Sequence, residues 1–119
     1  MTLSRLSILV FPETIRTWTA RALERDLSAS GNSVETAIDT LLKVARAHIV
    51  YDLRHGREPL SAFGAAPQIY RNAFAGSMRV PIPMELSWDN SGAPIQILAA
   101  TAERHPAIRP PSATAARIA

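Results

Sequence analysis

The feature that most constrains the fold is a change of hydrophobic period around Gly31. In residues 18–22 apolar and polar side chains alternate, as in a half-buried strand, whereas from Val34 onward apolar side chains recur at helical spacing. A glycine between two such segments permits a sharp change of direction, because it has no Cβ to restrict the backbone. The chain is therefore predicted to turn from a strand directly into a helix.

Two residues compete to cap this helix. Asn32 lies three residues before Glu35, a spacing that approximates a capping box, and Ser33 offers a hydroxyl one residue later. An apolar stripe follows, with Asp39, Lys43 and Arg46 on the opposite side, so an amphipathic helix packed on a sheet is expected. The stripe consists of Val34, Ile38, Leu41, Ala45 and Ile49. Arg54, His55 and Gly56 are typical of the C-terminal end of a helix, so the helix is expected to stop there.

Three short strands are predicted before the helix. Leu3–Phe11 is rich in large apolar residues, Thr17–Leu23 alternates, and a shorter strand is expected around Leu27–Ser30. Segments so close in sequence can pair only as antiparallel hairpins. The predicted class is therefore α+β, with a small antiparallel sheet of three to four strands and one amphipathic helix packed on it.

The second half of the chain is less regular. Gln68–Ala75 could form two turns of helix, and Met78–Leu86 alternates like a strand whose prolines restrict it to a sheet edge or an extended arm. Residues 89–92 predict a turn and Ile95–Leu98 a short returning strand. The expected division is a sheet–helix domain at 1–58, a linker or short helix at 59–77, a ribbon-like strand and hairpin at 78–98, and a mobile Ala/Pro/Arg-rich tail at 99–119.

Composition excludes several classes of function. The chain has 119 residues and no cysteine, which removes thiol catalysis, zinc–thiolate sites and disulfides. Its formal net charge is +3, but Arg104, Arg109 and Arg117 against Glu103 place +2 of this in the tail. The rest is close to neutral and lacks the broad basic footprint of a strong nucleic-acid binder. No apolar run is long enough to span a membrane, and a cytoplasmic protein is expected.

One group of polar residues could form a metal-binding or acid–base site. His48, Asp52 and His55 are spaced i, i+4, i+7, so a continuous helix would align them on one face, where they could bind a metal or pair a base with a carboxylate. The same spacing fits the ordinary polar end of a helix that runs past its sheet. Glu24 and Asp26 could form a carboxylate pair, yet their position is that of a solvated turn. We therefore expect a protein that is not an enzyme, with no catalytic residue, no cofactor and no bound metal.

Residues 18–41 have a distinctive sequence pattern. It reads Trp18-x-Ala20-x-x-Leu23-Glu24-x-Asp26-Leu27-x-Ala29-x-Gly31-x-Ser33-x-Glu35-x-Ala37-x-x-x-Leu41. This pattern resembles the N-terminal domain of HicB-type antitoxins, and the resemblance covers roughly residues 6–53. In that family an aromatic strand, a short link and a small-residue strand precede a glycine and a hydroxyl that open a helix. Thr36 here replaces the acidic residue often found before the alanine.

Residues 74–86 carry a second resemblance. They read FAGSMRVPIPMEL, which is similar to the linker and β-ribbon that begin a ribbon–helix–helix DNA-binding domain in many such antitoxins. The chain then departs from that pattern, because the helix expected after Leu86 is replaced by a segment containing the helix breakers Gly92 and Pro94. Where the ribbon binds DNA, Arg79 is the expected contact.

The resemblance implies a fold, partners and a function. The family fold is a partial RNase H-like sheet with one helix and without catalytic carboxylates. The implied function is neutralisation of a small RNA-cleaving, HicA-like toxin by direct protein binding, in an active antitoxin or an orphan relative. Self-association into a dimer or higher oligomer is usual in the family. Two alternatives stay open: a DNA-binding autorepressor acting through residues 78–86, and a metal-dependent activity at His48, Asp52 and His55.

Overall fold

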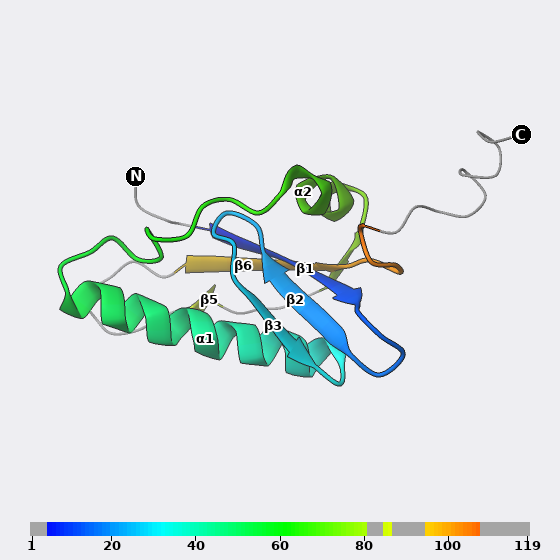
Figure 1. Cartoon of the computed structure of the whole chain (residues 1–119), viewed down its shortest axis with the longest axis horizontal. Helices are drawn as coiled ribbons and strands as arrows, with labels where there is room; N and C mark the ends of the chain where they lie inside the picture. The colour runs from blue at the N-terminus through cyan, green and yellow to red at the C-terminus, as the bar shows by residue number, and fades with distance from the viewer. Residues whose placement is uncertain (1–4, 81–84, 87–94, 108–119) are drawn as a thin grey trace, which may run out of the picture.

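The structure is a computed structural model that describes residues 5–80, 85–86 and 95–107. Within these residues a mixed β-sheet lies between two helices of unequal length (Figure 1). The predicted α+β class is confirmed. The elements, in chain order, are β1 (Arg5–Pro12), β2 (Trp18–Ala22), β3 (Ser28–Gly31), α1 (Val34–Arg54), α2 (Gln68–Ala75), β4 (Met78–Val80), β5 (Glu85–Leu86) and β6 (Ile95–Thr101).

The strands of the sheet follow the order β3-β2-β1-β6-β4, and β5 also pairs with β6. As predicted from the short connections, β1 pairs antiparallel with β2 and β2 pairs antiparallel with β3. In contrast, β6 runs parallel to β1, from the pair Arg5 and Gln96 to the pair Val10 and Thr101. The sheet is therefore mixed and wider than the expected antiparallel sheet of three to four strands. A parallel pair requires a long crossover, which short-range sequence patterns do not reveal.

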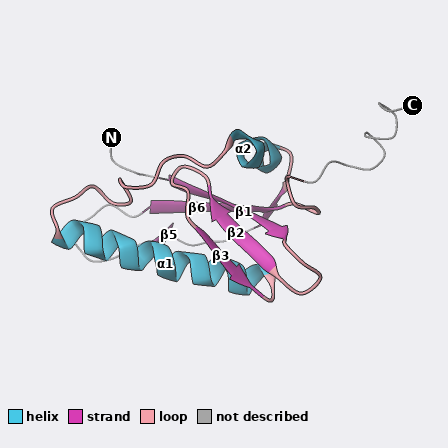
Figure 2. Cartoon of the chain, viewed as in Figure 1, coloured by secondary structure: helices cyan, strands magenta, loops and turns pink. Residues whose placement is uncertain are grey.

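β1 is the central strand, and both of its faces are covered (Figure 2). Leu6, Ile8 and Val10 belong to the core under α1, whereas Leu9 and Phe11 belong to a second core under α2. Since helices cover both faces, β1 is apolar along nearly its whole length. On the first face the predicted stripe of α1 packs as expected, and on the second Leu9 and Phe11 meet Tyr70, Ala73 and Phe74.

The observed length of β6 differs from two predicted boundaries, the end of the returning strand and the start of the tail. The returning strand expected at Ile95–Leu98 continues to Thr101, so the predicted start of a mobile tail at Ala99 is wrong. Ala99 and Ala100 are both buried, because their small side chains lie in the middle of the sheet between β1 and β4. The backbone of Ala102 also donates a hydrogen bond to Val10 O at 2.8 Å. A run of alanines thus belongs to a core strand.

The remaining elements agree with expectation where they are described. Gln68–Ala75, where two turns of helix were a possibility, forms α2, and α1 ends at Arg54, the first residue of the expected stop signal. β4 and β5 lie at the edge of the sheet and pair with β6, so these two described parts of the segment predicted as a ribbon at 78–98 join the same sheet as β1. The predicted turn at 89–92 and the tail beyond residue 107 lie outside the described residues.

Candidate functional site

The strand-to-helix corner is built by direct contact between Gly31 and the first turn of α1. A Cβ added to Gly31 would lie 2.6 Å from the backbone nitrogen of Ala37 and 2.8 Å from the carbonyl carbon of Thr36. Both neighbours are backbone atoms that cannot rotate away. Ala37 is itself fully buried. The glycine and the alanine of the sequence pattern therefore serve the same close approach of β3 to α1.

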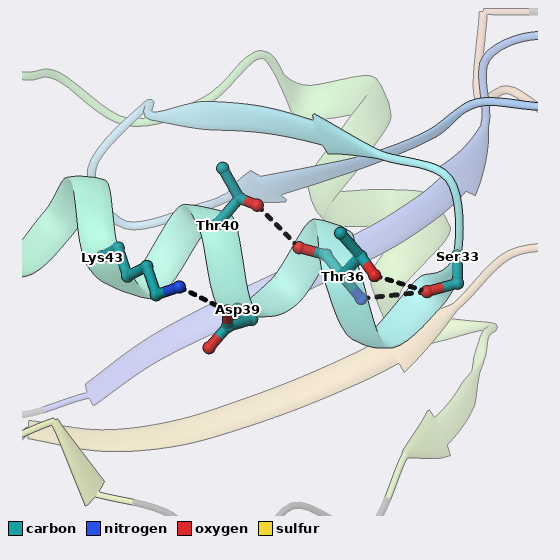
Figure 3. A network of polar contacts seen from close by, with 5 residues as sticks. All are labelled: Ser33, Thr36, Asp39, Thr40 and Lys43. Atoms are coloured by element: carbon teal, nitrogen blue, oxygen red, sulfur yellow. Dashed lines mark hydrogen bonds and ion pairs between the residues drawn. The ribbon is translucent and has the colours of Figure 1, made fainter.

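Ser33, rather than Asn32, caps α1 (Figure 3). Ser33 Oγ accepts a hydrogen bond from Thr36 N at 3.1 Å and donates to Thr36 Oγ1 at 2.8 Å. Thr36 occupies the position that a capping box gives to Glu or Gln, and its hydroxyl contacts the cap in their place. On the same exposed side of the helix, Thr40 Oγ1 donates to Thr36 O at 2.8 Å, and Lys43 pairs with Asp39 at 3.0 Å.

The structure does not bring His48, Asp52 and His55 into one site. Asp52 is only 5% exposed, and its Oδ2 accepts a hydrogen bond from Leu60 N at 2.8 Å. Leu60 has a φ of 60°, so this bond holds the loop after α1 in a left-handed conformation. The rings of His48 and Phe63 meet edge to face, with their centroids 5.1 Å apart. The ring of His55 stacks on that of Tyr51, with centroids 4.1 Å apart. Among the described residues, no three His, Asp or Glu side chains are grouped to hold a metal ion.

Arg79, the predicted DNA contact, lies on the edge strand β4 and is exposed. Its Nη1 donates a hydrogen bond to Phe74 O at 3.0 Å, and its guanidinium lies 4.1 Å from the centre of the Phe74 ring. The backbone of β4 is paired with β6 of the same chain. Both the side chain and the inner edge of the strand are thus engaged within the protein.

Each of the two carboxylates between β2 and β3 has its own partner. Glu24 accepts hydrogen bonds from Ser7 N at 2.6 Å and Ser7 Oγ at 2.7 Å, and Arg5 lies 3.7 Å away. Asp26 binds Arg21 with two hydrogen bonds, at 2.7 and 2.9 Å. Hydrogen bonding to Asp26 raises the pKa of the Arg21 guanidinium above its usual value, although burial opposes the shift. The two carboxylates therefore anchor the hairpins and do not form a shared acid–base pair.

A polar and aromatic cluster that sequence patterns did not indicate joins the segment after β6 to the β1–β2 hairpin. Glu13 Oε2 lies 3.2 Å from His105 Nε2, and Glu13 Oε1 accepts a hydrogen bond from Thr19 Oγ1 at 3.1 Å. His105 Nδ1 accepts from Ala107 N at 3.1 Å, so Nε2 carries the proton that faces Glu13. The imidazole also meets the edge of Phe11 at 4.7 Å. With both ring nitrogens engaged, His105 is an anchor for the segment after β6.

Two exposed apolar side chains lie at one end of the sheet. Ile15, in the loop between β1 and β2, is 101% exposed, and Met78, at the start of β4, is 77% exposed. Met78 pairs with Thr101, which pairs with Val10, so Met78 lies at the same end of the sheet as the β1–β2 loop. In the sequence, Ile15 lies between the polar residues Thr14 and Arg16, in the segment that joins two predicted strands. A large apolar side chain that is this fully exposed is a candidate contact for a protein partner.

No family model matches this chain, and neither a curated protein nor a solved structure is significantly similar to it. Within the described part of the chain, neither helix is long and apolar enough to cross a membrane.

Proposed function

We propose that this chain is a HicB-like antitoxin, or an orphan relative of that family, which neutralises a small RNA-cleaving toxin by binding it directly. The proposal is carried by the corner at Gly31. The distinctive residues of the HicB-like pattern there each have a physical role, since Gly31 allows the close approach, Ser33 caps the helix and Ala37 packs at the contact. A sheet–helix unit with that corner is what the resemblance implies.

The proposed binding surface is the end of the sheet that carries Ile15 and Met78. Partner proteins obtain most of their binding energy from a few apolar or aromatic anchors that become fully buried in the interface. Ile15 is suited to this role, because burying its exposed side chain removes apolar area from water while the hairpin holds it in place. The acidic and basic groups nearest to it, Glu13 and Arg16, would lie at the rim.

Co-expression with the toxin encoded beside this chain tests the proposal. The wild-type chain should restore growth and copurify with the toxin. Ile15→Asp should weaken the complex by about 2 kcal/mol, which is roughly 30-fold in Kd, because a carboxylate would be buried in an apolar contact. Ile69→Asp is the matched control, since Ile69 is also exposed but lies on α2. Absence of both rescue and complex with the wild-type chain would refute the proposal.

DNA-binding autorepression through residues 78–86 is the second candidate. One observation favours it: β4 is an edge strand whose outer edge is unpaired within the described residues, so a second copy could add a strand there. The proposal requires Arg79 to exchange Phe74 for DNA. Arg79→Ala should then weaken operator binding, measured by mobility shift, by at least threefold (about 0.7 kcal/mol). Unchanged binding would count against this candidate, as would operator binding that does not fall steeply with salt.

A further inference from the structure

The second half of α1 and the residues that flank it carry a local excess of positive charge, although the folded part of the chain is close to neutral as a whole. Residues 43–57 contain four cations, Lys43, Arg46, Arg54 and Arg57, and one acid, Asp52. Asp52 is buried and bonded to the loop backbone, so it does not lie on the surface beside the arginines. The cations themselves are all exposed. This end of the helix is therefore a local cationic surface on an otherwise balanced protein.

Three of these cations are available to a ligand. Lys43 pairs with Asp39, whereas Arg46, Arg54 and Arg57 form no ion pair within the part of the chain that the structure describes. The acid next in sequence, Glu58, is exposed and leaves the net charge of this surface positive. Arg54 in the last turn also stabilises the helix dipole, which explains one arginine at this end but not three.

An aromatic stack lies beside Arg54 and Arg57. The rings of Tyr51 and His55 stack with centroids 4.1 Å apart and an interplanar angle of 28°, and His55 Nδ1 lies 2.8 Å from Tyr51 O. The guanidinium of Arg57 is 5.9 Å from the centre of the Tyr51 ring. Tyr51 is 51% exposed, so this stack faces solvent. Arg54, three residues after Tyr51, lies beside it on the helix surface. We call Tyr51, Arg54, His55 and Arg57 the α1 patch.

We propose that the α1 patch binds single-stranded nucleic acid, with backbone phosphates on the arginines and a base on the Tyr51–His55 stack. Arginine forks match phosphate geometry, and unpaired bases stack on tyrosine and histidine rings. An acidic protein would satisfy the charge but would give the stack no role. A base-paired duplex would keep its bases away from the rings. Cations placed around a ring platform are the arrangement by which proteins hold single strands with little sequence preference. The proposal is independent of toxin binding.

The test is fluorescence anisotropy with the full chain and a short labelled oligouridylate, across a range of salt concentrations. In the double variant R54Q/R57Q affinity should fall at least tenfold, and the slope of log K against log salt should shrink by about 1.4, since each lost phosphate contact on a single strand contributes about 0.7. The matched control is R16Q/R71Q, which removes two exposed arginines elsewhere and the same net charge. The control should change affinity less than threefold.

Tyr51→Ala tests the stacking half of the proposal without changing charge. It should weaken binding about fivefold or more, because the loss of one base–aromatic stack has an effect of that size. Thermal melting of each variant checks that the fold is retained. The proposal is overturned if the wild-type chain shows no saturable binding, if R16Q/R71Q lowers affinity as much as R54Q/R57Q, or if Tyr51→Ala has no effect. Equal binding of a duplex, or equal competition by polyglutamate, would overturn it as well.

Discussion

At the scale of single residues, Gly31 has no space for a side chain. Gly31→Ala would place a methyl group 2.6 Å from Ala37 N, and the helix would have to move away from β3. We expect a loss of about 1–3 kcal/mol in the free energy of unfolding, measured by urea denaturation. Gly64→Ala is the control, because a Cβ there meets nothing within 4 Å and should change stability by less than about 0.5 kcal/mol. Equal losses at the two glycines would contradict the contact at the corner.

Variants of Asp52 show whether its side chain is a structural carboxylate or a metal ligand. Asp52→Ala would leave Leu60 N without its buried partner and should cost about 1–3 kcal/mol. Asp52→Asn keeps an acceptor oxygen and should cost less. Because Asp52 is already bonded and His55 is stacked on Tyr51, added zinc should leave the melting temperature of the wild-type chain unchanged. A stoichiometric rise in melting temperature with zinc, lost in Asp52→Asn, would instead support the metal-dependent alternative.

At the scale of elements, β6 joins the second half of the chain to the sheet formed by the first half. Ile97 is 3% exposed and lies in the core under α1, next to β1, whereas its neighbour Gln96 faces away and is exposed. Ile97→Ala should therefore destabilise the protein by about 2–5 kcal/mol, and Gln96→Ala by less than about 0.5 kcal/mol, in thermal or urea unfolding. Similar small effects at both positions would mean that β6 is not a core strand.

The elements also divide into those that local sequence could predict and those that it could not. β1, β2, β3 and α1 follow from local period, turn residues and caps, and they lie close to the predicted ranges, whereas α2 was only a possibility within an irregular segment. The pairing of β6 with β1 is a long-range contact. Its consecutive alanines, Ala99 and Ala100, carry no strand-like alternation, and both are buried. The Glu13–His105 contact also joins residues far apart in the sequence, so local patterns do not reveal it. Of the candidate sites, the sequence could place Arg79 on an edge strand but could not reveal its contact with Phe74.

At the scale of the whole molecule, two kinds of surface lie on different elements. The exposed apolar side chains of Ile15 and Met78 lie at the end of the sheet where β1 ends, and they form the proposed toxin-binding surface. The α1 patch is at the C-terminal end of the helix and suits a polyanion. This separation predicts that Ile15→Asp should leave oligouridylate binding unchanged. It also predicts that R54Q/R57Q should leave toxin binding unchanged.

The most direct test of the proposed toxin neutralisation is an RNA-cleavage assay with the small protein encoded beside this chain, which the proposal expects to be the toxin. Increasing amounts of the purified chain are added, and the remaining cleavage is measured together with complex formation by gel filtration. Neutralisation by direct binding predicts that cleavage falls linearly to zero at a fixed molar ratio, at which all the toxin elutes with this chain. Undiminished cleavage in excess chain, with the two proteins eluting separately, would contradict it.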